Sequence, residues 1–224
     1  VIPLVFLAIF FAWPVAALVA RGFSSDGTST LGAVAEVLGS ARTWRILRTT
    51  LTLAILGSAA SVLLGIPGAY LLYAVRFPGR GLLRALVTVP FVLPTVVVGV
   101  AWVAVLGPSG PLAGLRLDES LPAIVLALVF FNYAVVVRTV GGLWSRLDPR
   151  AVEAARSLGA SPARAFRTVT LPALMPAIAS AAALVFLFCA SAFGIIMVMG
   201  GVRYSTIETE IWYQTTQLLD LPAA

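Results

Sequence analysis

The sequence predicts an all-α fold, a polytopic bundle of transmembrane helices. Of its 224 residues 60% are hydrophobic and only 11% are charged, and the mean hydropathy is +1.03. A soluble domain carries roughly 25% charged residues, so this chain has too little polar surface to cover a water-exposed exterior. Backbone groups in lipid must be paired within the structure, and the short alternating segments typical of a transmembrane barrel are missing from the sequence. We therefore expect helical spans.

Runs without charge define those spans. A helix needs about 20 mostly apolar residues to cross the hydrocarbon core. Five stretches meet or approach this length, and we expect spans at 1–20, 49–75, 85–106, 120–141 and 173–199. The first is longer than the apolar region of a signal peptide, which favours a true span. Pro90 and Pro94 lie inside the third, where they predict a kink that serves either a pathway or packing.

All 15 basic residues are arginine, and their distribution predicts the orientation in the membrane. With the loop after the second span placed inside, the inner segments hold nine arginines and a net charge of +7, and the outer segments hold six and a net charge of −1. The positive-inside rule then places the N-terminus inside and the chain end outside. Arg42, Arg45 and Arg48 cluster on the outer side, where we expect a short amphipathic helix on the membrane surface. We also expect a turn at 24–27 and a surface helix over 30–38.

The composition excludes several kinds of site. The chain has no His and one Cys, so it can form neither a disulfide framework nor a His/Cys metal site. It has no lysine for a phosphate-binding loop, so we expect no catalytic site, no cofactor bound by this chain and no ATP hydrolysis by it. The expected spans contain no Asp, Glu or His, which counts against an ion-coupled secondary transporter. The arginines are split between the two membrane faces, so we expect no nucleic-acid partner.

The longest polar segment on the inner side, 144–172, is predicted to begin with a short helix. Asp148 can act as its N-cap and Pro149 suits the first helical position. The helix is expected over 150–158, and Gly159 is placed to end it as a glycine after a helix commonly does.

A second short helix is expected over 163–169. Ser161 and Pro162 are placed to cap and open it. Leu171 and Pro172 are expected to close the loop at the membrane, just before the last span.

One surface of this helical loop is suited to contact with another protein. Four small side chains keep it shallow, namely Ala154, Ala155, Ala160 and Ala163. Leu158 and Phe166 can supply apolar contact. A plain connector between packed helices has about 2–8 residues, and this segment is several times longer. A docking element is therefore favoured over a solvated connector.

Glu153-Ala154-Ala155, followed by Gly159 and then by Leu171-Pro172 twelve residues beyond it, resembles the EAA motif. That motif marks the membrane permease subunits of binding-protein-dependent ABC importers. The resemblance implies a type I ABC importer permease fold, with five of an expected six spans in this sequence. It also implies that 144–172 is the coupling loop that docks on an ATPase subunit. The residues so implied are Glu153, Ala154, Ala155, Gly159, Ser161, Pro162, Phe166, Leu171 and Pro172.

A second resemblance concerns the substrate. The segments 130–132 (FFN), 189–201 (CASAFGIIMVMGG) and 204–212 resemble permeases for thiamine and for ferric iron. Those permeases are often double-length chains with two six-span halves. The resemblance therefore implies thiamine or ferric iron as the solute and a partial first half. The second half would come from the same longer chain or from a second copy.

The same resemblance implies the partners and the pathway. They are two copies of an ABC ATPase subunit that uses the ATP, an extracytoplasmic solute-binding protein and the second permease half, assembled in a bacterial cytoplasmic (inner) membrane. Polar or flexible residues of the inner spans are candidates to line the pathway: Asn132, Tyr133, Ser191, Phe193 and Gly194, with Met197 and Met199 nearby. Each could equally serve helix packing. A membrane assembly subunit without transport is the other alternative, and association with an ATPase and ATP-dependent uptake would distinguish them.

Overall fold

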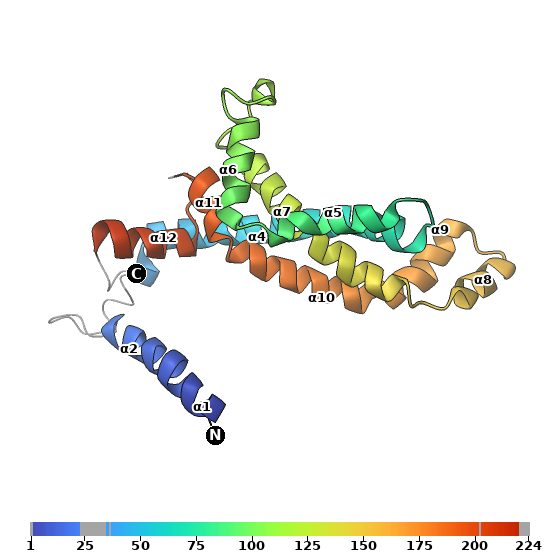
Figure 1. Ribbon diagram of the computed structural model, residues 1–224, viewed down its shortest axis with the longest axis horizontal. Helices are drawn as coiled ribbons and strands as arrows, with labels where there is room; N and C mark the ends of the chain where they lie inside the picture. Colours follow the sequence, from blue (N-terminus) through green and yellow to red (C-terminus); the bar gives the residue numbers. More distant parts are fainter. Residues whose placement is uncertain (1, 23–34, 36, 202, 220–224) are drawn as a thin grey trace. The chain divides into compact units, whose positions relative to one another are not determined.

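The structure is a computed structural model that describes residues 2–22, 35, 37–201 and 203–219. Within these ranges every regular element is a helix (Figure 1), which confirms the expected all-α class. The chain divides into two compact units, Val1–Thr50 with Ser205–Ala224, and Leu51–Tyr204. The turn expected at 24–27 and most of the surface helix expected over 30–38 lie outside the described residues.

Within the described part of the chain, four helices are long and apolar enough to cross a membrane, and a bent pair adds a fifth if it counts as one span. The first comprises α1 (Ile2–Leu7), a π-helical turn (Ala8–Ala12) and α2 (Trp13–Gly22). Its apolar part, Pro3–Ala20, has a mean hydropathy of 2.3 and is 0% buried. A helix that is apolar on all sides and exposed is suited to lipid, which agrees with the span expected at 1–20.

In the first unit, α4 (Ala41–Ala69) begins at Ala41 rather than at residue 49. The separate amphipathic surface helix expected around Arg42, Arg45 and Arg48 is therefore wrong, because these arginines lie in the first turns of α4 itself. The Arg42 guanidinium forms an ion pair with Glu210 of α12 (Ile207–Tyr213), with an Nη2–Oε1 distance of 2.8 Å.

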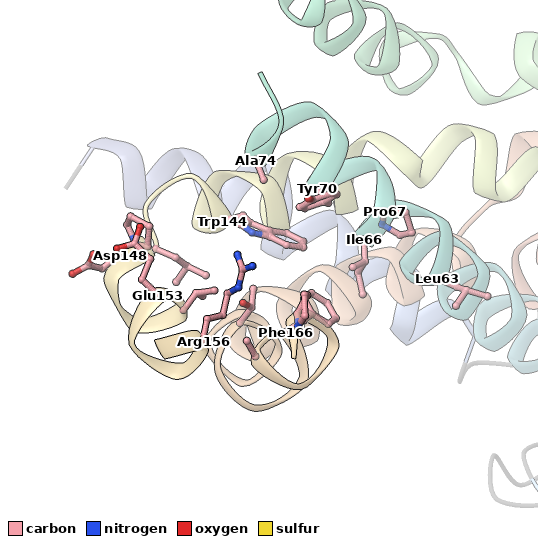
Figure 2. A pocket seen from close by; sticks show the side chains of 16 residues that line it. Leu63, Ile66, Pro67, Tyr70, Ala74, Trp144, Asp148, Glu153, Arg156 and Phe166 are labelled. Atoms are coloured by element: carbon pink, nitrogen blue, oxygen red, sulfur yellow. The ribbon is translucent and has the colours of Figure 1, made fainter. Parts of the chain in front are cut away.

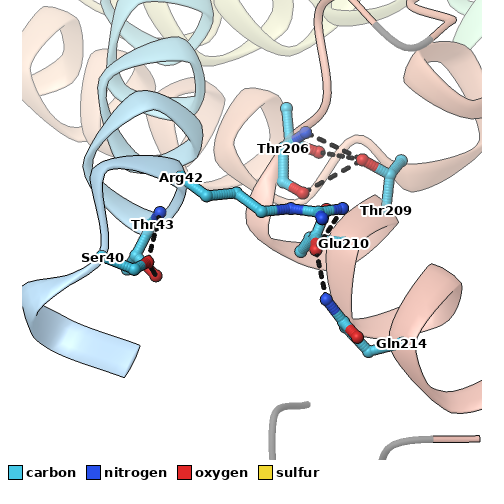
Figure 3. A network of polar contacts seen from close by, with 7 residues as sticks. All are labelled: Ser40, Arg42, Thr43, Thr206, Thr209, Glu210 and Gln214. Carbon is cyan, nitrogen blue, oxygen red and sulfur yellow. Dashed lines mark hydrogen bonds and ion pairs between the residues drawn. The ribbon is translucent and has the colours of Figure 1, made fainter. Parts of the chain in front are cut away.

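Further polar contacts surround that ion pair (Figure 3). Gln214 Nε2 donates to Glu210 Oε1 at 2.7 Å, and the Arg42 guanidinium lies 5.8 Å from the Tyr213 ring centre. The Thr50 hydroxyl oxygen accepts from the Ile207 backbone N–H at 3.1 Å. These contacts join the start of α4 to α12.

The second unit is built around α7 (Leu121–Trp144). Ser120 caps it, since its hydroxyl oxygen accepts from the Ala123 N–H at 3.4 Å. Fully buried side chains recur every four residues along α7 and so form one face of the helix. Its members are Ile124, Leu128, Asn132, Val136 and Val140. This helix packs against α10 (Leu171–Ala190), which lies beside it in Figure 1.

Small residues bring α4 close to α7 and α10. A Cβ on Gly57 would lie 2.8 Å from Cys189 Sγ, and a Cβ on Gly65 would lie 2.5 Å from Val136 Cγ1. Ser58 Oγ donates to the Ala182 carbonyl of α10 at 2.9 Å. Close backbone approach through small residues is how helices gain packing energy in a membrane, where apolar surface alone gives no preference for a neighbour.

We expect Gly65→Ala to destabilise the protein by about 1–3 kcal/mol, because the new methyl group overlaps both Val136 Cβ and Val136 Cγ1 and no rotamer of Val136 moves its Cβ away. Thermal unfolding of the protein in detergent would measure the loss. The matched control is Gly142→Ala, since a Cβ there meets nothing within 4 Å. Equal melting temperatures of the two variants would contradict the prediction.

The third expected span, 85–106, is broken rather than kinked. It consists of α5 (Arg80–Val92) and α6 (Thr95–Leu106), which are bent by 102° at the break. Leu93 has φ −71° and ψ 144°, the extended conformation that a residue before proline prefers. Pro94 has φ −57° and ψ 133° and supplies no N–H, so the chain leaves the helix for two residues before α6 begins.

The last expected span, 173–199, is also broken. Here α10 ends at Ala190, and α11 (Phe193–Met199) is a separate short helix. It packs against α6, as Figure 1 shows. A Cβ on Gly194 would clash with Thr95 Oγ1 and lie 2.7 Å from the Val96 backbone nitrogen, and a Cβ on Gly99 would lie 3.0 Å from Val198 Cβ. The short helix therefore rests against the first turns of α6, immediately after the other break.

Candidate functional site: the helical loop between α7 and α10

The loop begins with α8 (Pro149–Ser157). Its N-terminus is stabilised by the Asp148 carboxylate, whose Oδ1 accepts from the Arg150 N–H at 2.9 Å, and Pro149 occupies the first turn. Gly159 follows the helix with φ +87°, in the left-handed region that glycine adopts without strain. The predicted N-cap, first-turn proline and terminal glycine are all confirmed.

The second loop helix begins as predicted but does not end as predicted. Ser161 Oγ accepts from the Arg164 N–H at 3.3 Å and caps α9 (Pro162–Ala165). The helix then continues through a π-helical turn (Phe166–Thr170) directly into α10. The expectation that Leu171 and Pro172 close the loop is therefore wrong.

The physical reason lies in the wider turn that precedes Pro172. The Leu171 N–H bonds to the Phe166 carbonyl five residues earlier. A proline lacks an N–H and its ring clashes with the carbonyl of the preceding turn, and a wider turn is one way to accommodate that ring without ending the helix. Three residues of the predicted coupling loop, Phe166, Leu171 and Pro172, thus belong to one helix that is continuous from Pro162 to Ala190.

The outer surface of α8 is open. Glu153 and Ala154 are exposed, and Ala155 is half-buried. Leu158 is 90% exposed, the highest value among the large hydrophobic side chains that the structure describes as exposed. The ion pair of Arg42 with Glu210 is the only one among the described residues, so Glu153 has no cationic partner there. The helix thus presents an apolar and an anionic side chain that make little contact with the rest of the described fold.

The inner side of the loop encloses a cavity of about 900 Å³ (Figure 2). Its walls come from the end of α4 with the turn Tyr70–Ala74, the end of α7, α8, and α9 with the turn after it. Trp144 lies between two aromatic side chains, with ring centres 5.4 Å from Tyr70 and 6.0 Å from Phe166. Of the predicted docking residues, Glu153, Pro162 and Phe166 line this cavity. No local sequence pattern indicates this cavity, because its α4 wall is distant in sequence from the loop.

The five candidate pathway residues lie in two places. Asn132 is 0% exposed within the second unit, where its Nδ2 donates to the Leu128 carbonyl at 2.9 Å and to Cys189 Sγ at 3.5 Å. Its Oδ1 has no partner. Tyr133, next in the chain, is half-buried and its hydroxyl group contacts Gly68. In this structure Asn132 acts in helix packing.

The other three candidates lie at the break between α10 and α11. Ser191 is exposed and donates to the Leu187 carbonyl at 2.9 Å. Phe193 is half-buried, and Gly194 is buried against α6. The break at Leu93 and Pro94 adjoins them through α6, a proximity that was not predicted from the sequence. The sequence shows Pro90, Pro94 and Gly194, but no local signal indicates that segments about 100 residues apart lie in contact.

Comparisons with known proteins agree with this architecture. Residues 61–224 match the family described as binding-protein-dependent transport system inner membrane component. The sulfate transport system permease protein CysT of Salmonella typhimurium is 34% identical over 185 residues, covering 79% of this chain and 67% of that protein. A 2-aminoethylphosphonate permease protein, PhnU, from the same organism is 27% identical, covering 94% and 78%. The thiamine permease protein ThiP of Brucella abortus is 31% identical, covering 75% of this chain and 33% of that longer protein.

Solved structures share the fold. An ABC transporter for import of the acidic polysaccharide alginate matches with a TM-score of 0.79 at 19% identity, covering 100% of this chain and 85% of that one. The MetNI methionine ABC transporter matches with a TM-score of 0.60 at 21% identity, covering 82% and 87%. The resemblance to ABC importer permeases is confirmed, and the secondary-transporter and assembly-subunit alternatives are set aside. The chain belongs to the binding-protein-dependent transport system inner membrane component family and is a permease component of an ABC importer.

Proposed function

We propose that this chain forms one membrane half of an importer in a bacterial cytoplasmic membrane, with α8 as the helix that docks on a separate ATPase subunit. The observation that carries the proposal is the open surface of α8, where Leu158 is 90% exposed and its N–H bonds to the carbonyl of exposed Ala154 one turn earlier. A leucine exposed to that degree on a polar loop costs free energy, roughly 1.5–3 kcal/mol, that burial against a partner recovers. The small side chain of Ala154 lets a groove on the ATPase subunit approach the backbone of α8 closely.

The fold offers a mechanical route from that helix to the spans. Gly159 joins α8 to α9, and α9 is continuous with α10 up to Ala190. After the break, α11 packs on α6. When two ATPase subunits close on ATP, a movement of α8 would be transmitted along the long helix to the two breaks. The pathway would open and close there, against the second permease half, with the solute delivered by an extracytoplasmic binding protein.

The solute that the relatives favour is a small tetrahedral oxyanion. CysT is a sulfate permease protein and PhnU is a putative 2-aminoethylphosphonate permease protein. The described helices that could span the membrane contain no Asp or Glu, so an anion meets no like charge in them. For the same reason these helices offer ferric iron no carboxylate ligand. Thiamine is the second candidate, supported by the 31% identity to ThiP.

Cross-linking from α8 tests the docking role. The chain has one cysteine, Cys189, which is buried, so a cysteine introduced at exposed Ala154 can be labelled selectively. With the membrane complex intact, we expect Ala154→Cys to cross-link to the ATPase subunit and Asp118→Cys, exposed on the predicted outer loop, to give no such product. A complex that transports solute while Ala154→Cys remains uncross-linked would refute the docking role.

Uptake into vesicles that contain the importer, its binding protein and internal ATP tests the solute. We expect labelled sulfate or 2-aminoethylphosphonate to accumulate and thiamine not to. Accumulation of thiamine alone would replace the oxyanion proposal with the second candidate. If neither sulfate, 2-aminoethylphosphonate nor thiamine accumulates in an ATP-dependent way, both solute proposals are refuted.

A further inference from the structure

Two fully buried side-chain oxygens in the second unit have no hydrogen-bond partner among the described residues. They are Ser61 Oγ of α4 and Asn132 Oδ1 of α7, and both residues are 0% exposed. The space beside such fully covered atoms does not admit a water molecule, so water satisfies neither oxygen in this arrangement. Native proteins rarely leave such groups unpaired, because each one costs free energy. The two oxygens therefore require a physical explanation.

The unpaired hydroxyl group of Ser61 differs from other hydroxyl groups of the same helix. Thr50 donates to the Ile46 carbonyl at 2.9 Å, which is the common bond to the carbonyl four residues earlier. Ser58 donates to the Ala182 carbonyl of α10 at 2.9 Å. Ser61 forms neither kind of bond. Its hydroxyl group can therefore donate to an acceptor that a movement brings beside it.

Packing contacts fix the register between α4 and α7. A Cβ on Gly57 would lie 3.5 Å from Leu128 Cβ, and a Cβ on Gly65 would lie 2.6 Å from Val136 Cβ. The two contacts are eight residues apart on each helix. Residues spaced by four lie on one face of a helix, so the two helices run in the same direction with these faces in contact.

Ser61 and Asn132 lie at the midpoints of these two intervals, four residues from each contact. The two oxygens are thus at the same level on facing surfaces of α4 and α7, although no hydrogen bond joins them. On either side of Ser61 the α4 surface carries only glycine, so no side chain of α4 has to pass a side chain of α7 when the helices move. Small sliding movements between packed helices are a common form of conformational change.

We propose that α4 shifts against α7 when the ATPase subunits close on ATP, and that the Ser61 hydroxyl group then donates to Asn132 Oδ1. The described arrangement is the state without this bond. Because the bond exists in one state only, it favours that state over the other. This inference rests on the proposed function, since the ATPase subunits supply the movement, but it does not depend on the identity of the solute.

Thermal unfolding of the protein in detergent, without nucleotide, tests the unpaired state. Ser58→Ala removes an existing hydrogen bond and is expected to lower the melting temperature by about 2–4 °C. Ser61→Ala removes a hydroxyl group without a partner, so the melting temperature should stay the same or rise. A decrease of the same size in both variants would overturn the inference, because Ser61 would then be bonded in the nucleotide-free protein.

Binding of a non-hydrolysable ATP analogue to the complete importer in nanodiscs tests the paired state. Ser61→Ala should raise the half-saturating concentration of the analogue about two- to tenfold, the equivalent of one net hydrogen bond. In an Asn132→Leu background Ser61→Ala should have no further effect, because the acceptor is already missing. Ser58→Ala is the matched control and should bind the analogue as the parent does, since its hydroxyl group contacts α10 and not Asn132.

Unchanged binding in Ser61→Ala, or the same change in the Asn132→Leu background, would refute the inference. The cross-link from Ala154→Cys separates this failure from that of the proposed function. If the cross-link to the ATPase subunit forms while Ser61→Ala binds the analogue like the parent, the docking role stands and the shift of α4 is refuted. If no cross-link forms, the proposed function fails and the ATP-driven shift fails with it.

Discussion

Leu158→Asp is expected to reduce ATP-driven uptake by at least about tenfold while the protein still inserts and folds. The side chain is 90% exposed, so the substitution breaks no contact within the described fold. In the proposed complex the same side chain is buried on the ATPase subunit, and burying an unpaired carboxylate there costs several kcal/mol. Co-purification of the ATPase and ATP-dependent uptake in vesicles would both decrease.

The control is Leu115→Asp, at another exposed leucine, 58% exposed, in the short helix Ala113–Leu115. It adds the same charge to the protein but lies outside the proposed docking surface. Glu153→Lys gives an independent check, since Glu153 is an exposed side chain of α8 at the rim of the cavity and the substitution reverses its charge without changing Leu158. Normal ATPase association and uptake in both Leu158→Asp and Glu153→Lys would show that α8 is not the docking helix.

The local structure of this loop could be predicted because its signals are local. An aspartate before a proline, a glycine ten residues after that proline and a serine before a second proline each act on their own backbone neighbours. The hydrogen bonds of Asp148 and Ser161 and the positive φ of Gly159 confirm each of them. Such signals need no knowledge of the rest of the chain.

The breaks in the spans could not be located in this way. A run of residues without charge indicates that a segment is apolar. It does not indicate whether the segment forms one helix or two. Pro94 predicted a kink, but the bend of 102° is stabilised by the packing of α6 against α11. Conversely Pro172 suggested a boundary, and a single π-helical turn carries the helix past it.

Asn132 shows a signal that the sequence did contain. It occupies the four-residue stripe with Leu128 and Val136, which predicts a buried position at the packed face of α7. The four-residue spacing predicts that Asn132 is buried in the core, although its polar side chain suggests a pathway residue. Its contact with Cys189 of α10 depends on tertiary packing, and no local pattern indicates it.

The contact between the two broken spans is the part of the fold most sensitive to one methyl group. Gly194 of α11 faces the first turn of α6, where a Cβ would meet Thr95 Oγ1 and the Val96 backbone nitrogen. A side chain can rotate out of the way, but the nitrogen belongs to the helix backbone and moves only if α6 moves. In the proposed mechanism, a movement of α10 reaches α6 through α11 and this contact, beside the route through α7.

Gly194→Ala is therefore expected to lower stability by about 1–3 kcal/mol and to reduce uptake by at least about tenfold, because the methyl group forces α11 away from α6. Thermal unfolding in detergent and vesicle uptake, measured on the same preparations, would separate the two effects. Gly81→Ala is the matched control, since Gly81 is a helical glycine of α5 where a Cβ meets nothing within 4 Å. Gly65→Ala supplies the comparison at similar stability, because it disturbs α4 against α7 and leaves this contact intact. If Gly194→Ala and Gly65→Ala lose uptake only in proportion to their lost stability, the contact serves folding alone. A further loss of uptake confined to Gly194→Ala would show that the two breaks move as one unit during transport.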